Sequence, residues 1–224
     1  MPPRFSNRTE AGHALAERLS RLAGEDVIVL ALPRGGVPVG AEIARALHAP
    51  LDVFNVRKLG VPWHDELAMG AIAAGGVRVL NNDVIMTAGV TEEDLDQVTA
   101  LQQIELDRRE RLYREGRPPP SFTGKTVVLV DDGIATGATA RAAIQVIRSR
   151  NPVKLVVAVP VIQESVAGEL AREVDELVTV LEPSDLFAIG AWYDDFAQLS
   201  DDDVRRILAE TATSDETEAS RHAQ

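Results

Sequence analysis

Two adjacent aspartates, Asp131 and Asp132, directly follow an apolar run and precede a loop of small residues. The run over residues 127–130 is typical of a strand buried on both faces of a sheet. Open parallel sheets bind ligands at the carboxyl ends of their strands, and carboxylates there can accept hydrogen bonds from vicinal hydroxyls. The loop GIATGAT leads into a predicted helix, and its backbone N–H groups suit a phosphate. Together these features predict a site for a ribose 5-phosphate.

Two further clusters supply positive charge earlier in the chain. Arg34-Gly35-Gly36 forms a predicted turn between a strand and a helix, where backbone amides and a guanidinium converge on an anion. Arg57 and Lys58 are adjacent at the end of the next predicted strand, and Glu66 follows in a loop as a candidate proton donor or acceptor. A solvated Arg-Lys pair and an ordinary strand-to-helix turn are the structural alternatives. The two basic clusters both precede the acid pair in the chain, and this order favours one common site for all three.

The segment VVLVDDGIATGATA, residues 127–140, resembles the phosphoribosyl pyrophosphate (PRPP) signature of type I phosphoribosyltransferases. That signature is a hydrophobic strand, two acids and a loop containing Thr-Gly. The resemblance implies that Asp131 and Asp132 hold the ribose 2′ and 3′ hydroxyls and that the loop holds the 5′-phosphate. The loop residues assigned in this way are Ala135, Thr136, Gly137, Ala138 and Thr139.

The same resemblance assigns the pyrophosphate of PRPP to the basic clusters. Arg34-Gly35-Gly36 would grip it, with a cis peptide expected between Pro33 and Arg34. Arg57 and Lys58 would contact it as the leaving group. Mg²⁺ is the expected cofactor, because it prefers oxygen ligands and arrives with substrate phosphates. Its expected ligands are Asp131, Asp132 and Asp194.

The segment LFAIGAWYDDF, residues 186–196, resembles the hood of 6-oxopurine phosphoribosyltransferases. Phe187 would stack on the base, which does not name the base because any planar ring can stack. A structural role as core aromatics is equally compatible with Trp192, Tyr193 and Phe196. The 6-oxopurine enzymes carry an aspartate as general base in the phosphate loop, where this chain has Ala135. The acceptor therefore stays open.

Apolar runs alternate with helical patterns along the chain, which predicts an α/β fold with a doubly wound, mostly parallel sheet and a small hood formed by terminal segments. We expect one domain over residues 1–210, with its core at about 25–181 and the hood segment at about 182–200. Residues 67–80 are expected to form a hairpin or flap, and residues 211–224 a disordered tail. The predicted strands cover residues 27–32, 51–56, 127–130, 155–159 and 177–181, and the predicted helices residues 9–22, 37–47, 91–115, 139–150, 164–172 and 202–210.

Composition narrows the class of protein. The 224 residues carry a net charge of −12, which argues against nucleic acid as a primary partner. No cysteine is present, so disulfides and thiolate chemistry are excluded, and the four histidines lack metal-ligand spacing. No apolar run is long enough to span a membrane, and the start of the chain lacks a signal-peptide pattern, so we expect a cytoplasmic protein. The family resemblance suggests a homodimer.

Three functions follow from these patterns. The leading hypothesis is a Mg²⁺-dependent transfer of the phosphoribosyl group from PRPP to a nitrogenous base or related amine, with release of pyrophosphate. The alternative is a regulatory protein that senses PRPP or a nucleotide with little turnover, since fold does not fix function. A third is a receiver-like phospho-acceptor domain, because such domains also end a strand in two aspartates.

Overall fold

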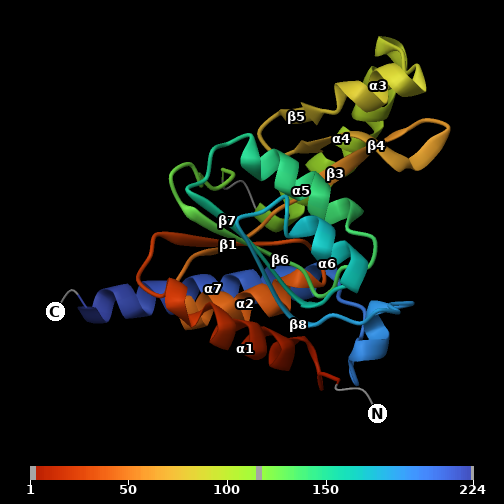
Figure 1. Ribbon diagram of the computed structural model, residues 1–224. Helices are drawn as coiled ribbons and strands as arrows, with labels where there is room; N and C mark the ends of the chain where they lie inside the picture. The colour runs from red at the N-terminus through yellow and green to blue at the C-terminus, as the bar shows by residue number, and fades with distance from the viewer. Residues whose placement is uncertain (1–3, 115–117, 223–224) are drawn as a thin grey trace. The chain divides into compact units, whose positions relative to one another are not determined.

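The structure is a computed structural model that describes residues 4–114 and 118–222, without the side chains of Glu66 and of residues 213–222 (Figure 1). The chain divides into two compact units, which we describe one at a time. Unit 1 comprises Met1–Val53, Phe122–Thr136 and Pro152–Gln224, and unit 2 comprises Phe54–Ser121 and Gly137–Asn151. The expectation of one domain over residues 1–210 stays a prediction.

Unit 1 contains a five-stranded sheet in the order β2-β1-β6-β7-β8, in which every neighbouring pair is parallel. The predicted doubly wound α/β class is therefore confirmed. Strands β1 and β6 are buried at every residue, as their continuous apolar runs predict. The strands are β1 (Val27–Ala31), β2 (Leu51–Val53), β6 (Thr126–Val130), β7 (Lys154–Val161) and β8 (Glu176–Leu181).

The helices of unit 1 include α1 (Arg8–Leu19), which continues as η1 (Ser20–Leu22), and α2 (Gly36–Leu47). Their apolar faces form one core cluster with alternate strand residues, among them Val29, Val128 and Val156. Figure 1 shows α1 and α2 side by side along one face of the sheet. This packing fixes where α1 begins relative to the strand ends.

Strand order places a topological switch point between β1 and β6. The chain leaves β1 through α2 toward β2 on one side, whereas β6 lies on the other side of β1. Ala31 pairs with Val130 at the carboxyl ends of the two strands. Ligands of open α/β sheets bind in the crevice at such a point, so the turns after β1 and β6 are the expected site.

The two terminal segments of unit 1 meet beyond the sheet. After α6 (Glu164–Leu170) and β8, the chain forms η2 (Ile189–Trp192), and Tyr193 pairs as an isolated bridge with Phe5. The Phe5 N–H donates to the Trp192 carbonyl at 3.0 Å, and the Asp194 N–H donates to the Phe5 carbonyl at 2.8 Å. A hood segment built from both termini agrees with this pairing.

The last helix, α7 (Asp201–His222), is longer than predicted. The sequence predicted a helix ending at residue 210 and disorder beyond it, but residues 211–222 continue the helix. Thr211 is buried, and its hydroxyl donates to the Ile207 carbonyl one turn earlier at 2.9 Å. Tertiary packing at this position outweighs the polar composition that suggested disorder.

Unit 2 contains an antiparallel sheet in the order β3-β4-β5. The hairpin expected over residues 67–80 is present, formed by β4 (His64–Ala73) and β5 (Val77–Leu80), and β3 (Val56–Val61) pairs with β4. One face of this sheet packs on α3 (Asn82–Ala88) and α4 (Glu92–Arg114). The unit also contains α5 (Ala138–Arg148), which contacts all three strands.

Two predictions need correction here. The single strand expected over residues 51–56 is divided: β2 ends at Val53 in the parallel sheet, and β3 starts at Val56 in the antiparallel one. Helix α3 was not predicted, although Asn81 caps it by accepting a hydrogen bond from the Val84 N–H. Across the described residues, no helix combines the length and hydropathy needed to cross a membrane.

Candidate functional site

The acid pair occupies the turn after β6. Because β6 is fully buried, Asp131 and Asp132 leave the sheet with little water around them, and 11% of the Asp132 side chain is exposed. The Asp132 N–H donates to Asp131 Oδ1 at 2.9 Å. Burial and the neighbouring Asp132 carboxylate raise the pKa of Asp131 well above its ordinary value, and burial also raises the pKa of Asp132. Two carboxylates in this environment favour partners that donate hydrogen bonds.

An arginine that the sequence did not single out contacts this pair. Arg8, the first residue of α1, donates from Nε to Asp132 Oδ2 at 2.8 Å, and 11% of each side chain is exposed. The charge of Arg8 counteracts the effect of burial on the pKa of Asp132. The acid pair is therefore compensated by one cation within unit 1.

The backbone of Asp132 is also held. The Tyr193 hydroxyl donates to the Asp132 carbonyl at 2.6 Å, and burial raises the pKa of Tyr193. Tyr193 packs between the rings of Phe5 and Phe196, at centroid separations of 5.6 Å and 4.9 Å. Its role as a buried core aromatic, one of the two interpretations of this segment, is confirmed.

The turn after β1 lies against the acid pair, as its position at the switch point predicts. The peptide bond between Pro33 and Arg34 is cis, which confirms the expectation. A Cβ atom at Gly35 would collide with the Asp132 carboxylate, and one at Gly36 would lie 2.6 Å from the Val130 carbonyl oxygen. Glycine at both positions therefore lets the turn approach the strand that bears the acids.

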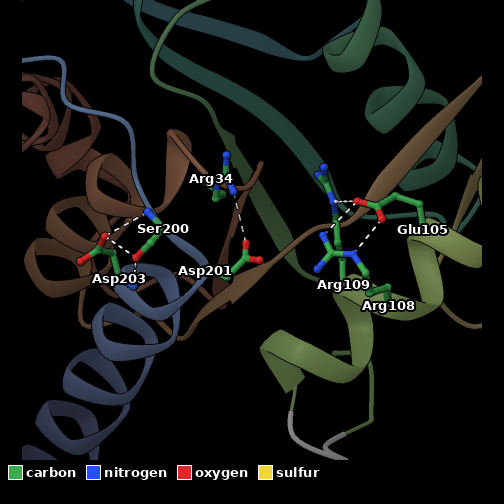
Figure 2. Close-up of polar contacts among 7 residues, drawn as sticks. All are labelled: Arg34, Glu105, Arg108, Arg109, Ser200, Asp201 and Asp203. Carbon is green, nitrogen blue, oxygen red and sulfur yellow. Dashed lines mark hydrogen bonds and ion pairs between the residues drawn. The ribbon is translucent and has the colours of Figure 1, made fainter.

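The Arg34 side chain points toward the start of α7. Its Nη1 lies 3.6 Å from Asp201 Oδ1, and both side chains are partly exposed (Figure 2). Helix α7 begins here because Ser200 caps it: the Asp203 N–H donates to Ser200 Oγ at 3.1 Å, and the Ser200 N–H donates to Asp203 Oδ2 at 3.0 Å. A helix cap thus places a carboxylate beside Arg34.

The predicted phosphate loop starts in unit 1 and ends in unit 2. Ile134, which follows β6 in the chain, lies beside the end of β7, where its N–H donates to the Val161 carbonyl at 2.9 Å. Ala135 is half-buried, and Thr136 is exposed. Gly137 has a left-handed backbone with φ of 74° and caps α5, whose first residues are Ala138 and Thr139. The first N–H groups of a helix have no partner within it, so this terminus suits an anion.

Arg57 and Lys58 do not lie at the end of a strand of the parallel sheet, as the sequence predicted, but inside β3 of unit 2. Neighbouring residues of a strand point to opposite faces, so these two side chains diverge. Arg57 Nε donates to Gln102 Oε1 of α4 at 2.9 Å, whereas Lys58 pairs across the sheet with Ala71. Burial, with a smaller contribution from nearby Arg109, lowers the pKa of Arg57.

Glu66, Phe187 and Asp194 are the remaining predicted residues. Glu66 falls within β4, but its side chain is outside the described part of the chain, so its acid-base role stays a prediction. Phe187 is 98% exposed, which is compatible with a stacking platform. Asp194 is exposed and, through its N–H, contacts Phe5.

Comparison with known proteins identifies the family. The phosphoribosyl transferase domain matches residues 7–195, which include the acid pair, the turn after β1 and the phosphate loop. The chain belongs to the phosphoribosyl transferase domain family. The receiver-like hypothesis is thereby set aside, because the acid pair is part of a different domain.

Two relatives and one solved structure agree with this phosphoribosyl transferase domain. Proteins from two Mycobacterium tuberculosis strains, provisionally named as phosphoribosyl transferases, are 50% identical to this chain over 204 residues. The match covers 91% of this chain and 46% of theirs, so the chain spans about half of their length. The crystal structure of TT1426 from Thermus thermophilus has a TM-score of 0.87 and 42% identity, covering 92% of this chain and 98% of that one.

The donor set of the phosphoribosyl transferase domain bears on Mg²⁺. Asp131 and Asp132 offer carboxylate oxygens, the ligand type that this ion prefers. Within residues 4–114 and 118–222, no group of three or more His, Cys, Asp or Glu side chains gathers in a way that could hold a metal ion. The role of Asp194, the predicted third ligand, stays a prediction. An ion bound through one or two carboxylates together with substrate phosphates and water still fits these residues.

Sequence reasoning missed the contacts of Arg8 and Tyr193 with Asp132 and the contact of Asp201 with Arg34 in the phosphoribosyl transferase domain. Arg8 lies 124 positions from Asp132, and Tyr193 lies 61 positions from it. No local pattern relates positions so far apart. Asn7 is a favourable N-cap residue that could have marked the start of the helix, but it does not indicate which strand end that helix start reaches.

Proposed function

We propose that this domain binds PRPP with Mg²⁺ and transfers the 5-phosphoribosyl group to a nitrogenous base or related amine, releasing pyrophosphate. The observation that carries the proposal is the contact between the two turns at the switch point, where Gly35 abuts the Asp132 carboxylate. That contact brings a guanidinium-bearing turn and two carboxylates together inside unit 1, as a sugar bearing a pyrophosphate would require.

The acid pair would serve the ribose. Carboxylates accept hydrogen bonds from the 2′ and 3′ hydroxyls, and their negative charge faces the positive charge that develops on the sugar when the bond to pyrophosphate breaks. Asp131 and Asp132 are suited to this because burial strengthens such interactions. The loop from Ala135 to Thr139 would hold the 5′-phosphate through backbone amides and the two threonine hydroxyls.

The turn after β1 would serve the leaving group. Arg34 supplies positive charge and the Gly35 amide a hydrogen-bond donor for the pyrophosphate, whereas the Gly36 N–H already donates to the Leu32 carbonyl at 3.0 Å. Lys58 and Arg57 diverge in β3, so regular strand geometry allows one of them, not both, to face the same ligand. Arg57 donates to Gln102 of α4, and both cations stay candidates for contact with the leaving group.

Mg²⁺ fits the carboxylates of Asp131 and Asp132, and when bound it neutralises charge on the phosphate oxygens. The chain's own part is to orient the sugar and to supply Arg34. For the acceptor, the exposed ring of Phe187 is the proposed stacking surface. Ala135 leaves the loop without a side-chain base, so Glu66 stays the candidate for proton transfer.

A binding experiment tests the proposal. Titration calorimetry with PRPP and Mg²⁺ should give saturable binding to the wild-type protein and a loss of at least about a hundredfold in affinity for Asp131→Asn plus Asp132→Asn. The matched control is Glu92→Gln plus Glu93→Gln, which removes two adjacent charges from the exposed start of α4. Absence of PRPP binding by the wild type would contradict the proposal.

The regulatory alternative rests on Ala135, which removes the loop base. Pyrophosphate release from PRPP should be measured with a panel of purine and pyrimidine bases and simple amines. Release with any acceptor supports the transferase. Saturable PRPP binding without release for any acceptor would favour the sensing function instead.

A further inference from the structure

The cap that starts α1 positions Arg8 beside the acid pair. The Glu10 N–H donates to the Asn7 side chain at 3.0 Å, and the Ser6 N–H donates to Glu10 Oε2 at 2.5 Å. This reciprocal arrangement fixes the first turn of the helix, as in a capping box. Arg8 is the first helical residue, so the cap fixes its backbone position independently of the contacts of its side chain.

The guanidinium of Arg8 is held at three points. Its Nε donates to Asp132 Oδ2 at 2.8 Å, its Nη1 donates to the Ala197 carbonyl at 3.0 Å, and its central carbon lies 3.8 Å from the centroid of the Phe196 ring. The last two contacts do not involve Asp132. Two of the three contacts therefore orient the guanidinium independently of the carboxylate.

This arrangement has two consequences for Asp132. Its Oδ2 atom is fixed, which restrains rotation of the carboxylate and sets the direction of the other oxygen. Arg8 also places a positive charge 2.8 Å from this buried carboxylate. A neutral hydroxyl of a sugar meets a fixed acceptor instead of a rotating one, which lowers the entropy cost of binding.

We propose that Arg8 is a positioning residue of the ribose subsite, acting through the Asp132 carboxylate from the other end of the chain. This inference rests on the proposed function, because it assumes that Asp132 accepts a ribose hydroxyl. Arg8 makes no described hydrogen bond or ion pair with Arg34, Gly35 or Gly36, so we expect its main effect on the sugar.

The competing explanation is that Arg8 only ties α1 to the segment after η2. The two explanations differ in which ligands lose affinity. A positioning residue of the ribose subsite affects ribose 5-phosphate and PRPP but not inorganic pyrophosphate. A structural tie affects thermal stability and all three ligands alike, or none of them.

The test uses the whole chain as wild type, Arg8→Met and Arg8→Lys, with Arg18→Met as the matched control. Arg18 lies on the same helix and donates to the Thr179 carbonyl at 2.9 Å, away from the acids. Calorimetry with Mg²⁺ is run for ribose 5-phosphate, PRPP and inorganic pyrophosphate, and melting temperatures are recorded for every variant. Wild-type binding of PRPP tests the proposed function by itself, before any variant is compared.

For Arg8→Met we expect affinity for ribose 5-phosphate and PRPP to fall by about tenfold or more. Affinity for pyrophosphate should stay within about twofold of wild type. Arg8→Lys should recover part of the loss, because it restores the charge without the planar geometry of the guanidinium. In turnover, the KM for PRPP should rise more than kcat falls.

A double-mutant cycle decides whether Asp132 mediates the effect. In an Asp132→Asn background, Arg8→Met should cause no further loss of affinity for ribose 5-phosphate. The inference is overturned if wild type binds PRPP but Arg8→Met binds all three ligands as wild type does, or weakens all three equally. It is also overturned if the tenfold loss persists in the Asp132→Asn background.

Discussion

At the scale of residues, the candidate site contains two acids whose burial lowers the stability of the fold. Two adjacent carboxylates leave a fully buried strand, and burial raises the pKa of both. Arg8 and Tyr193 compensate part of this cost, the first through the Asp132 side chain and the second through its backbone. Asp131 accepts the Asp132 N–H, but no cation of the described residues forms an ion pair with it. The free-energy cost of burying two adjacent carboxylates therefore falls mainly on Asp131.

Replacing Asp131 by Asn should stabilise the protein at neutral pH while abolishing PRPP binding. Asn keeps an oxygen that can accept the Asp132 N–H but carries no charge, so desolvation and repulsion are relieved. We expect a gain of about 1 kcal/mol in the free energy of unfolding at pH 7. Urea unfolding measures it, with Asp185→Asn as the exposed control.

The stability gain of Asp131→Asn should depend on pH, and the sign of this dependence follows from the raised pKa of Asp131. The folded protein binds the Asp131 proton more readily than the unfolded chain does, so ionised Asp131 destabilises the fold at higher pH. The gain in free energy of unfolding from Asp131→Asn should shrink as pH falls through the raised pKa of Asp131. It should vanish below the ordinary carboxyl pKa of 3.8. An advantage that grows toward acid pH would contradict the prediction.

At the scale of elements, helix starts carry the site. The cap at Asn7 places Arg8 beside Asp132, the cap at Ser200 places Asp201 beside Arg34, and Gly137 starts the helix whose first turn is the proposed phosphate site. In each case a short local signal fixes a residue whose partner lies far away in sequence. Figure 2 shows the second of these, with Asp203 bonded back to Ser200.

Asp201 should compete with pyrophosphate for Arg34, because a carboxylate 3.6 Å from the guanidinium must lose this contact or share it when an anion binds. We expect Asp201→Asn to raise affinity for inorganic pyrophosphate with Mg²⁺ by about two- to threefold, since a partly exposed ion pair is weak. Calorimetry measures this affinity.

The control for this prediction is Asp202→Asn. Asp202 lies in the same first turn of α7 and pairs with Arg205 at 3.4 Å, so the change in charge at the helix start is matched. Equal gains for both variants would mean that general charge, and not the contact with Arg34, limits pyrophosphate binding.

Helix α4 provides a separate test of electrostatics in unit 2. Glu105 accepts hydrogen bonds from Arg108 Nε and Arg109 Nε, each at 2.8 Å, and these lower the pKa of Glu105 to about 2 (Figure 2). Glu105→Gln should cost about 0.5 kcal/mol of unfolding free energy at pH 7, the scale of solvent-screened pairs on a helix. Urea unfolding of the variant checks the value.

The pH dependence of this effect has a definite sign. A lowered pKa in the folded state means that ionised Glu105 contributes stability above its ordinary value of 4.5 and loses it as pH falls toward about 2. The difference between wild type and Glu105→Gln should thus be constant from about pH 7 to pH 5 and decrease below. Glu93→Gln, an exposed change on the same helix, is the control. A difference that is unchanged at about pH 3 would rule out the ion pairs as its source.

At the scale of the whole molecule, the net charge of −12 and the proposed polyanionic ligand are compatible if positive charge is local. Within unit 1, the acid pair has Arg8 and the turn after β1 has Arg34. Within unit 2, Arg57 and Lys58 diverge from β3, and the start of α5 adds a helix dipole. The homodimer and the cytoplasmic location stay predictions.

The sequence determined the parts of the protein that local patterns encode. Continuous apolar runs predicted β1 and β6, the alternation of strands and helices predicted the doubly wound sheet, and Gly35 and Gly36 predicted a turn that approaches an anion. The cis bond before Arg34 followed from family resemblance. Such features depend on neighbours within a few positions, so short windows of sequence suffice to find them.

Only the tertiary structure decided which of these parts meet. It divided the strand expected over residues 51–56 between two sheets, and it separated the side chains of Arg57 and Lys58 by placing both residues inside β3. It also brought Arg8 to Asp132 across 124 positions. By itself, the acid pair places two carboxylates at a buried position. Their compensation depends on how α1 packs on the sheet, a sum of many weak long-range contacts that no short segment contains.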